Sequence, residues 1–209
     1  MIDSNWKHLR LERTGRSIEV SFVSGGEFNL LTTAVMQELL DVATALRQDT
    51  EFNVVILSGD TRVFSGGIDL KDPEMLSMQD RSLAQQRQFV QLGPQMCAAW
   101  EALEQVTIAA IEGWCIGGAA ALVSALDWRV AARDATFRVP ELAIGMNMSW
   151  QSVPRFVSLI GPARTKELLI LAEPLPATKA HDWSLVDRLA EPGKSLACAR
   201  ELAGKVAAM

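Results

Sequence analysis

Two glycine-containing turns carry the residues of this sequence that could do chemistry. Each follows a short apolar run typical of a buried strand: VVILSGD leads into FSGGIDL, and TIAAIEG leads into WCIGGAAAL. Glycine at such a junction permits backbone angles that other residues avoid, and it lets a ligand approach the main chain closely. Free N–H groups at the start of a following helix point toward negative charge. Two such donors that converge on one oxygen would form an oxyanion hole.

Other reactive side chains are scattered and offer no metal site. Cys97, Cys115 and Cys198 lie far apart in the sequence, and His8 and His181 have no partner at ligand spacing. Neither turn matches a phosphate-binding loop of the G-x-x-x-x-G-K-[ST] or G-x-G-x-x-G type, and each taken singly also suits a tight structural turn. We therefore expect neither a disulfide framework nor a bound metal.

Three residues beside the turns favour structural roles over chemical ones. Asp69 is expected to order the first turn, and Glu112 to support the second. Cys115 precedes a predicted helix start that could lower its pKa, but its small neighbours favour simple packing.

Length and charge narrow the class of protein. The 209 residues, 49% of them hydrophobic and 22% charged, suit one domain over residues 1–209 with a substantial core. The net charge of -5, without any run of Lys or Arg, argues against a nucleic-acid partner. The first ten residues lack the apolar core of a signal peptide, and glycines and Glu112 interrupt the apolar segment Thr107–Leu126. We therefore expect a cytoplasmic protein that does not bind a membrane.

The elements that must position the two turns alternate between strands and helices. The hydrophobic patterns predict strands at Leu9–Glu12, Ile18–Val23, Val54–Leu57, Thr107–Ile111, Val130–Ala132 and Phe137–Val139. They predict helices from Thr32 or Thr33 to Arg47, over Asp80–Glu104 with a break near Gly93-Pro94, over Gly117–Leu126, and over most of the chain after Ser149. This alternation indicates an α/β fold whose sites lie where strands lead into helices.

Three motifs in this order and spacing resemble those of the crotonase superfamily, the enoyl-CoA hydratases and isomerases: FSGGIDL, GWCIGGAAAL and ATFRVPELAIG. The resemblance extends from the N-terminal hairpin to about Leu189. It implies a spiral of ββα units that binds an acyl-CoA thioester as its substrate. The matching positions make the backbone N–H groups of Ile68 and Gly118 the oxyanion pair around the thioester oxygen.

The resemblance also implies where coenzyme A binds. In the family, the loop around the first motif holds the adenine and the phosphates. The matching residues here are Arg62, Phe64, Gly66, Leu70 and Lys71. Lys71 is equally compatible with a solvated surface position. Coenzyme A enters as part of the substrate, so no permanently bound cofactor is expected.

The carboxylates indicate which reaction to expect. Hydratases of the family use two glutamates, and here Glu141 of Pro140-Glu141 matches the second while Ala121 occupies the position of the first. A single base suffices to remove a proton from C2 of a 3-enoyl-CoA and return it to C4. The pattern therefore resembles that of the family's 3-enoyl to 2-enoyl isomerases, with Glu141 as the sole base. A helix cap or surface ion pair is the structural alternative for Glu141.

A second departure from the hydratase pattern follows Pro140-Glu141. Hydratases usually have a glycine-rich stretch there that leaves room for an ordered water. This chain has Met148-Ser149-Trp150-Gln151, whose larger side chains are expected to exclude that water. We expect the acyl pocket to be bordered by Trp114, Ala121, Met148 and Trp150.

Two other functions stay open. One is a hydratase or hydratase-lyase that works with one glutamate; relatives that cleave aromatic acyl-CoAs share the GWC turn but rely on a tyrosine, which this chain lacks. The other is a non-catalytic acyl-CoA-binding homologue.

Family members usually continue with helices that build a homotrimer or a dimer of trimers. Because this sequence ends at Met209, we expect that helical part to be absent or truncated, and a trimer only where it exists.

Overall fold

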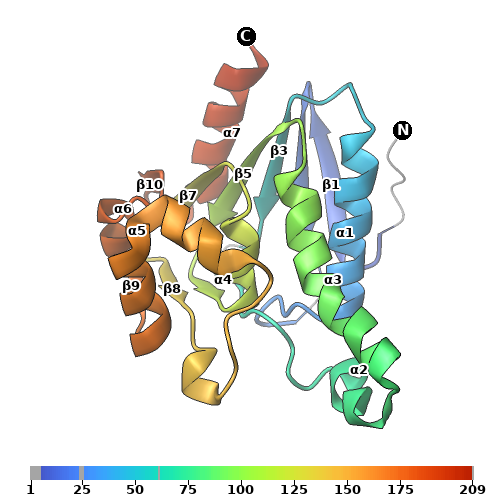
Figure 1. Cartoon of the computed structure of the whole chain (residues 1–209). Coiled ribbons are helices and arrows are strands. Elements are labelled where there is room, and N and C mark those ends of the chain that lie inside the picture. The colour runs from blue at the N-terminus through green and yellow to red at the C-terminus, as the bar shows by residue number, and fades with distance from the viewer. Residues whose placement is uncertain (1–5, 24–25, 61, 209) are drawn as a thin grey trace.

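Figure 1 shows the computed structural model, in which helices pack on both faces of a twisted β-sheet. The structure describes residues 6–23, 26–60 and 62–208. Within these residues no helix is both long enough and apolar enough to cross a membrane.

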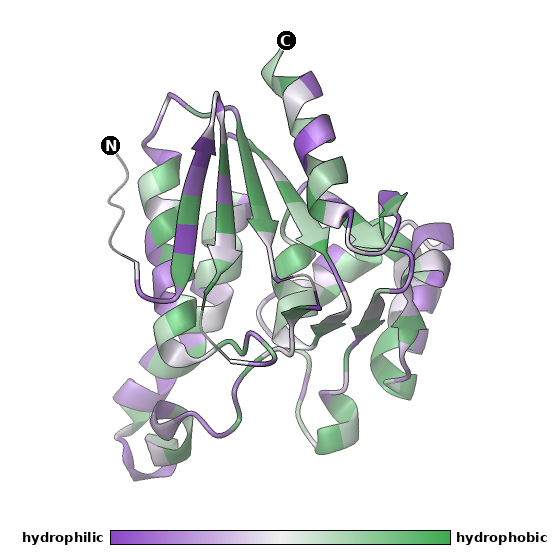
Figure 2. Ribbon diagram, turned by 180° about the vertical axis from the view of Figure 1, so that it is seen from behind, coloured by the Kyte–Doolittle hydropathy of each residue, from purple (hydrophilic) through white to green (hydrophobic). Residues whose placement is uncertain are grey.

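The larger sheet has six strands in the order β1-β2-β3-β5-β7-β10. Its strands are β1 (Leu9–Thr14), β2 (Ser17–Phe22), β3 (Val54–Ser58), β5 (Val106–Ile111), β7 (Trp128–Ala132) and β10 (Arg188–Ala190). β1 and β2 form an antiparallel hairpin, and every later strand runs parallel to its neighbour. All of β3 is buried, which explains its unbroken apolar run. The edge strand β1 instead alternates hydrophobic and hydrophilic residues (Figure 2).

Two long helices, α1 (Thr33–Arg47) and α3 (Leu83–Glu101), lie side by side over one face of this sheet (Figure 1). The fully buried Trp100 of α3 joins them, because its Nε1 donates to the carbonyl of Leu39 in α1 at 3.0 Å. On the opposite face lies α7 (Ser195–Ala207), which packs against the central strands.

A second sheet of four short strands has the order β4-β6-β8-β9. Its strands are β4 (Val63–Ser65), β6 (Trp114–Ile116), β8 (Thr136–Arg138) and β9 (Leu175–Pro176). Along the chain, β3 is followed directly by β4, β5 by β6, and β7 by β8. Each of these three pairs therefore takes the chain from the larger sheet into the smaller one, and a helix follows each pair.

The remaining helices connect these strands. They are α2 (Pro73–Leu76), α4 (Gly118–Val123), α5 (Ser152–Leu171), α6 (Ala177–Asp182) and the short 3-10 helices η1 (Ser77–Asp80) and η2 (Leu142–Ile144). The predicted α/β class is confirmed.

The break predicted at Gly93-Pro94 is wrong, because α3 continues through both residues. Pro94 leaves the carbonyl of Val90 without its usual helical donor, and Val90 lies on an exposed part of the helix where water can satisfy that carbonyl. The helix also starts later than predicted. Ser82 and Gln85 form a capping box that fixes its start at Leu83.

Candidate active site

The first glycine turn is held by the segment that precedes α1. The N–H of Leu31 donates to the carbonyl of Gly67 at 2.8 Å, and the N–H of Asp69 donates to the carbonyl of Leu31 at 3.2 Å. These two bonds form a parallel bridge between Leu31 and Ile68. The N–H of Ile68 therefore faces the opposite side, away from Leu31.

Asn29 holds the same turn through hydrogen bonds to β4. It is buried and adopts a left-handed backbone with φ of 45°. Its Nδ2 donates to the carbonyl of Val63 at 3.0 Å, and its own carbonyl accepts a hydrogen bond from Oγ of Ser65 at 2.7 Å. That Oγ in turn accepts the N–H of Gly67 at 3.1 Å. Sequence analysis missed Asn29, for which the tolerance of Asn for left-handed angles is the only local signal.

The second glycine turn brings the start of α4 to the first. Gly117 has φ of 52°, and its N–H donates to the carbonyl of Arg138 at 2.8 Å. Gly118 is the first residue of α4, so its N–H has no acceptor within that helix. A Cβ on Gly67 would lie 3.4 Å from the nitrogen of Gly118, so the two turns are in contact. Within the described chain, the N–H groups of Ile68 and Gly118 donate to no other residue.

Glu141 stands directly beside this pair of turns. It follows β8 and precedes η2, and its side chain is partly buried. Its Oε2 is buried and accepts no hydrogen bond from any described residue. Burial raises the pKa of Glu141, because the charged form loses hydration; the hydrogen bond from its own backbone N–H offsets this loss only in part. A carboxylate in this state is a stronger base than one on the surface.

These groups share one cavity of about 120 Å³. It is lined by Gly66, Gly67, Ile68, Leu70, Ile116, Gly117, Gly118, Ala121, Pro140, Glu141, Ile144, Met146, Asn147, Met148, Ser149 and Trp150. Among these residues Glu141 is the sole titratable side chain. The cavity therefore combines one base with the N–H groups of Ile68 and Gly118 in otherwise uncharged surroundings.

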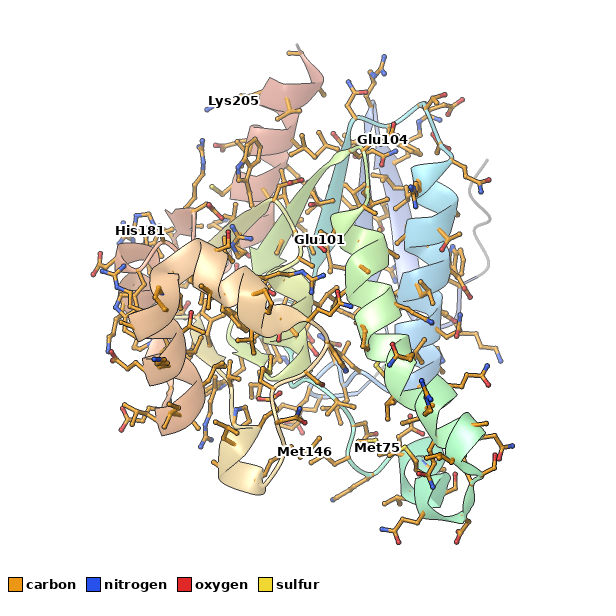
Figure 3. The ribbon with its side chains drawn as sticks, in the orientation of Figure 1. Met75, Glu101, Glu104, Met146, His181 and Lys205 are labelled. Atoms are coloured by element: carbon orange, nitrogen blue, oxygen red, sulfur yellow. The ribbon has the colours of Figure 1, made fainter. Side chains whose placement is uncertain are left out.

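The chain between η2 and α5 forms another wall of the cavity. Figure 3 labels Met146 on this loop, below the start of α5. Met148 and Trp150 line the cavity, as does Ala121 from α4, so the structure brings these three predicted residues to the site. Asn147 also lines it and was missed, because an exposed amide in a loop has no distinctive sequence pattern.

Trp114 and Phe64 lie elsewhere than predicted. Trp114, on β6, is 39% exposed and is not among the residues that line the cavity. Phe64 is fully buried in the core, where its ring and that of Phe22 pack edge to face at a centroid distance of 5.8 Å. Trp114 begins β6, whereas Ile116 at the other end of the strand lines the cavity. All three residues of β4 are buried, so Phe64 is enclosed in the core together with its neighbours.

The other predicted coenzyme A residues remain accessible. Gly66 and Leu70 line the cavity, and Leu70 is 45% exposed. The side chains of Arg62 and Lys71 are exposed and form no ion pair with any residue that the structure describes. These four residues offer backbone, apolar surface and two cations next to the first turn.

The contacts of three residues beside the turns fit structural roles: those of Glu112, Asp69 and Cys115. The Glu112 carboxylate accepts the N–H groups of Gly193 and Ser195, at 3.0 and 2.8 Å, and so caps the start of α7. Asp69 accepts the N–H of Lys71 at 2.9 Å within the first turn. Burial raises the pKa of the Cys115 thiol, which disfavours the reactive thiolate. No cluster of three or more His, Cys, Asp or Glu in the described ranges could hold a metal ion.

Known proteins with related sequences include enoyl-CoA hydratases. Residues 18–208 match the family model described as enoyl-CoA hydratase/isomerase. The crotonyl-CoA hydratase of Syntrophomonas wolfei is 30% identical over 179 residues, which are 85% of this chain and 67% of that protein. The short-chain-enoyl-CoA hydratase of Clostridium acetobutylicum is 28% identical over 197 residues, which are 94% of this chain and 74% of that protein.

Solved structures share the fold over nearly the whole chain. An enoyl-CoA hydratase from Bacillus anthracis superposes with a TM-score of 0.89 at 27% identity, covering 97% of this chain and 78% of that one. A Streptomyces coelicolor A3(2) protein provisionally described as an enoyl-CoA hydratase gives a TM-score of 0.93 at 25% identity, covering 99% and 75%. The crotonase-like fold implied by the three sequence motifs is thereby confirmed. The chain belongs to the enoyl-CoA hydratase/isomerase family.

Proposed function

We propose that this protein converts a 3-enoyl-CoA into its 2-enoyl isomer with Glu141 as the sole base. One observation carries the proposal: Glu141 is the only titratable side chain lining the cavity within the described residues, whereas α4 contributes Ala121. Addition of water in this family draws on two carboxylates, but a double-bond shift can run on one.

The reaction needs one group that takes a proton and gives it back. Glu141 removes a proton from C2 of the 3-enoyl thioester, and the electron pair left behind moves onto the thioester oxygen to give a dienolate. The N–H groups of Ile68 and Gly118 donate to that oxygen and stabilise its charge. The protonated Glu141 then returns the proton to C4. The double bond now joins C2 and C3, and the carboxylate is restored.

The environment of Glu141 supports this role. Its Oε2 accepts no hydrogen bond from the described residues, so the lone pairs are available for a substrate proton. Burial raises its pKa, which brings the base closer to the pH at which general-base catalysis is most effective.

Coenzyme A, in this proposal, arrives and leaves as part of the thioester. Gly66 and Leu70 at the cavity allow close approach of its apolar arm. The exposed cations Arg62 and Lys71 beside the same turn suit its phosphates, because neither is paired with a carboxylate in the described chain. No further cofactor is required by the chemistry.

Hydration with a single glutamate is the second candidate, because the two curated relatives are named hydratases. Against it, Met148 and Trp150 line the cavity, whereas hydratases of the family usually have a glycine-rich stretch at the matching positions. A water molecule held for attack would have to share this space with the acyl group.

The experiment supplies the wild-type protein with a 3-enoyl-CoA and, separately, a 2-enoyl-CoA, and separates products by chromatography. We expect isomerisation to exceed hydration by a factor of about 10² to 10⁴, the usual value of one acid–base group. Formation of 3-hydroxyacyl-CoA as fast as the isomer would overturn the proposal in favour of hydration. Binding of acyl-CoA without either product would identify a non-catalytic homologue.

A further inference from the structure

The indole of Trp150 is wedged between two glycines from different helices. A Cβ on Gly93 of α3 would lie 2.1 Å from Cε2 of the ring, and a Cβ on Gly118 of α4 would lie 2.6 Å from Cη2. Neither position can carry a side chain while the ring is in place. The two helices thus approach each other through Trp150 at a point where both lack side chains.

The backbone at this point is unusual and firmly anchored. Trp150 and Gln151 have φ values of 56° and 57°, a left-handed conformation that is uncommon for bulky residues. Nη1 of Arg155 donates to the carbonyl of Trp150 at 2.9 Å, and the same guanidinium makes two hydrogen bonds to the Glu101 carboxylate at 3.0 and 2.6 Å. Glu101, labelled in Figure 3, lies at the end of α3. Conformations this costly persist where the surroundings enforce them, and they concentrate at functional sites.

The same ring limits the cavity. Trp150, Gly118 and Ala121 all line it. An acyl group whose thioester oxygen binds the N–H of Gly118 would therefore share this cavity with Ala121 and with the ring edge of Trp150, which lies against Gly118. A longer acyl chain that continues toward α3 would meet the indole, because the ring fills the space up to Gly93.

We propose that Trp150 determines substrate specificity by closing the acyl cavity toward α3, which restricts the protein to acyl groups of crotonyl size. This inference rests on the proposed acyl-CoA function. It extends that function, because the identity of the base and the oxyanion donors says nothing about chain length. In this proposal the indole limits the length of the acyl chain, and Gly93 and Gly118 leave the space that the indole occupies.

Binding tests the length limit without relying on turnover. Calorimetric titration with butanoyl-CoA and octanoyl-CoA, which are saturated and cannot react, is expected to give at least tenfold tighter binding of butanoyl-CoA to the wild type. Trp150→Ala is expected to raise the octanoyl-to-butanoyl affinity ratio at least tenfold, and Trp150→Phe to give an intermediate ratio. A pocket that gains or loses methylenes typically discriminates by this amount or more.

Trp114→Ala is the matched control, since Trp114 is half-exposed and does not line the cavity; its affinity ratio should equal that of the wild type. Trp150→Phe retains most of the packing and keeps the test usable where Trp150→Ala does not fold. Equal affinity of the wild type for both ligands, or an unchanged ratio in Trp150→Phe and Trp150→Ala, would overturn the inference. A length limit observed in binding while 3-enoyl-CoA is not isomerised would refute the proposed reaction and leave the role of Trp150 standing.

Discussion

The Oε1 atom of Glu141 lies directly against Gly117, where a Cβ would come within 2.5 Å of it. Gly117 also has φ of 52°, so glycine is favoured here for two reasons: its backbone adopts this angle without strain, and its missing side chain leaves room for the Glu141 carboxylate. The next residue, Gly118, presents its N–H to the same cavity. The proposed base and one proposed oxyanion donor are therefore coupled through a single peptide unit, and a shift of one is expected to displace the other.

Gly117→Ala is expected to lower kcat by about 10²-fold, because the new Cβ must displace the Glu141 carboxylate. The left-handed backbone should add about 1–3 kcal/mol of lost stability. Gly15→Ala is the matched control, since Gly15 has φ of 60° with nothing within 4 Å of its Cβ. It should lose comparable stability in urea unfolding and keep its kcat. A Gly117→Ala enzyme with normal kcat would show that Glu141 need not lie where it does.

Glu141→Gln is expected to abolish turnover and to stabilise the protein at pH 8. A buried carboxylate with a raised pKa opposes folding wherever it is ionised, and the neutral amide removes that cost. The gain should be about 1.4 kcal/mol for each unit by which the pKa is raised. It should shrink as the pH falls through the raised pKa, because wild-type Glu141 is then protonated too, and vanish below 4.5.

The control for that comparison is Glu112→Gln. The Glu112 carboxylate caps α7 through two N–H groups, so its neutralisation should cost about 1–2 kcal/mol and leave kcat unchanged. Urea unfolding of both variants at pH 8 measures the change in the free energy of unfolding, which should be a gain for Glu141→Gln and a loss for Glu112→Gln. A destabilised Glu141→Gln at pH 8 would contradict the assignment of Glu141 as a base strained by burial.

The pH dependence of kcat/KM should report the same group. Glu141 acts as a base in its ionised form, so activity should rise with pH through the pKa of the free enzyme. Because burial raises that pKa, the midpoint of the acidic limb should lie above 4.5. A steady-state profile with a 3-enoyl-CoA measures it, and a midpoint at or below 4.5 would count against Glu141.

Much of the fold and part of the site could be predicted from sequence because local patterns encode them. The run Val54–Leu57 is apolar because β3 is covered on both faces, and the turns carry glycines because their backbones require them. The supports of the site could not be predicted in this way. Asn29 bonds to β4 across more than thirty residues, and no local pattern signals such a contact.

Gly93 shows why the predicted break in α3 was wrong. Next to Pro94 it is typical of a helix break, yet its lack of a side chain is explained by the indole of Trp150, 57 residues later in the chain. A glycine required by a distant side chain and one that ends a helix look the same in sequence.

Asn29 should prove to be a positioning residue for the first turn. Asn29→Gly keeps the left-handed backbone and loses the bonds of Nδ2 to β4, whereas Asn29→Ala also strains the backbone by about 1 kcal/mol. Both variants should lower kcat with little change in KM, since the oxyanion bond strengthens only in the transition state. Asn29→Ala should in addition unfold at lower urea concentration than Asn29→Gly. Normal kcat in both variants would leave Asn29 with a purely structural role.

The effect of Gly93→Ala on stability should change sign when Trp150 is replaced by alanine. In the wild type the new Cβ would lie 2.1 Å from the Trp150 ring, so the substitution should destabilise the protein and press the indole into the cavity. In the Trp150→Ala background that obstacle is gone, and alanine inside α3 should instead stabilise by about 0.5–1 kcal/mol, its usual advantage over glycine in a helix. Urea unfolding of the four proteins in this double-mutant cycle yields the coupling directly. Additive effects would mean that the ring and the glycine do not constrain each other, and the closure of the cavity toward α3 would need another cause.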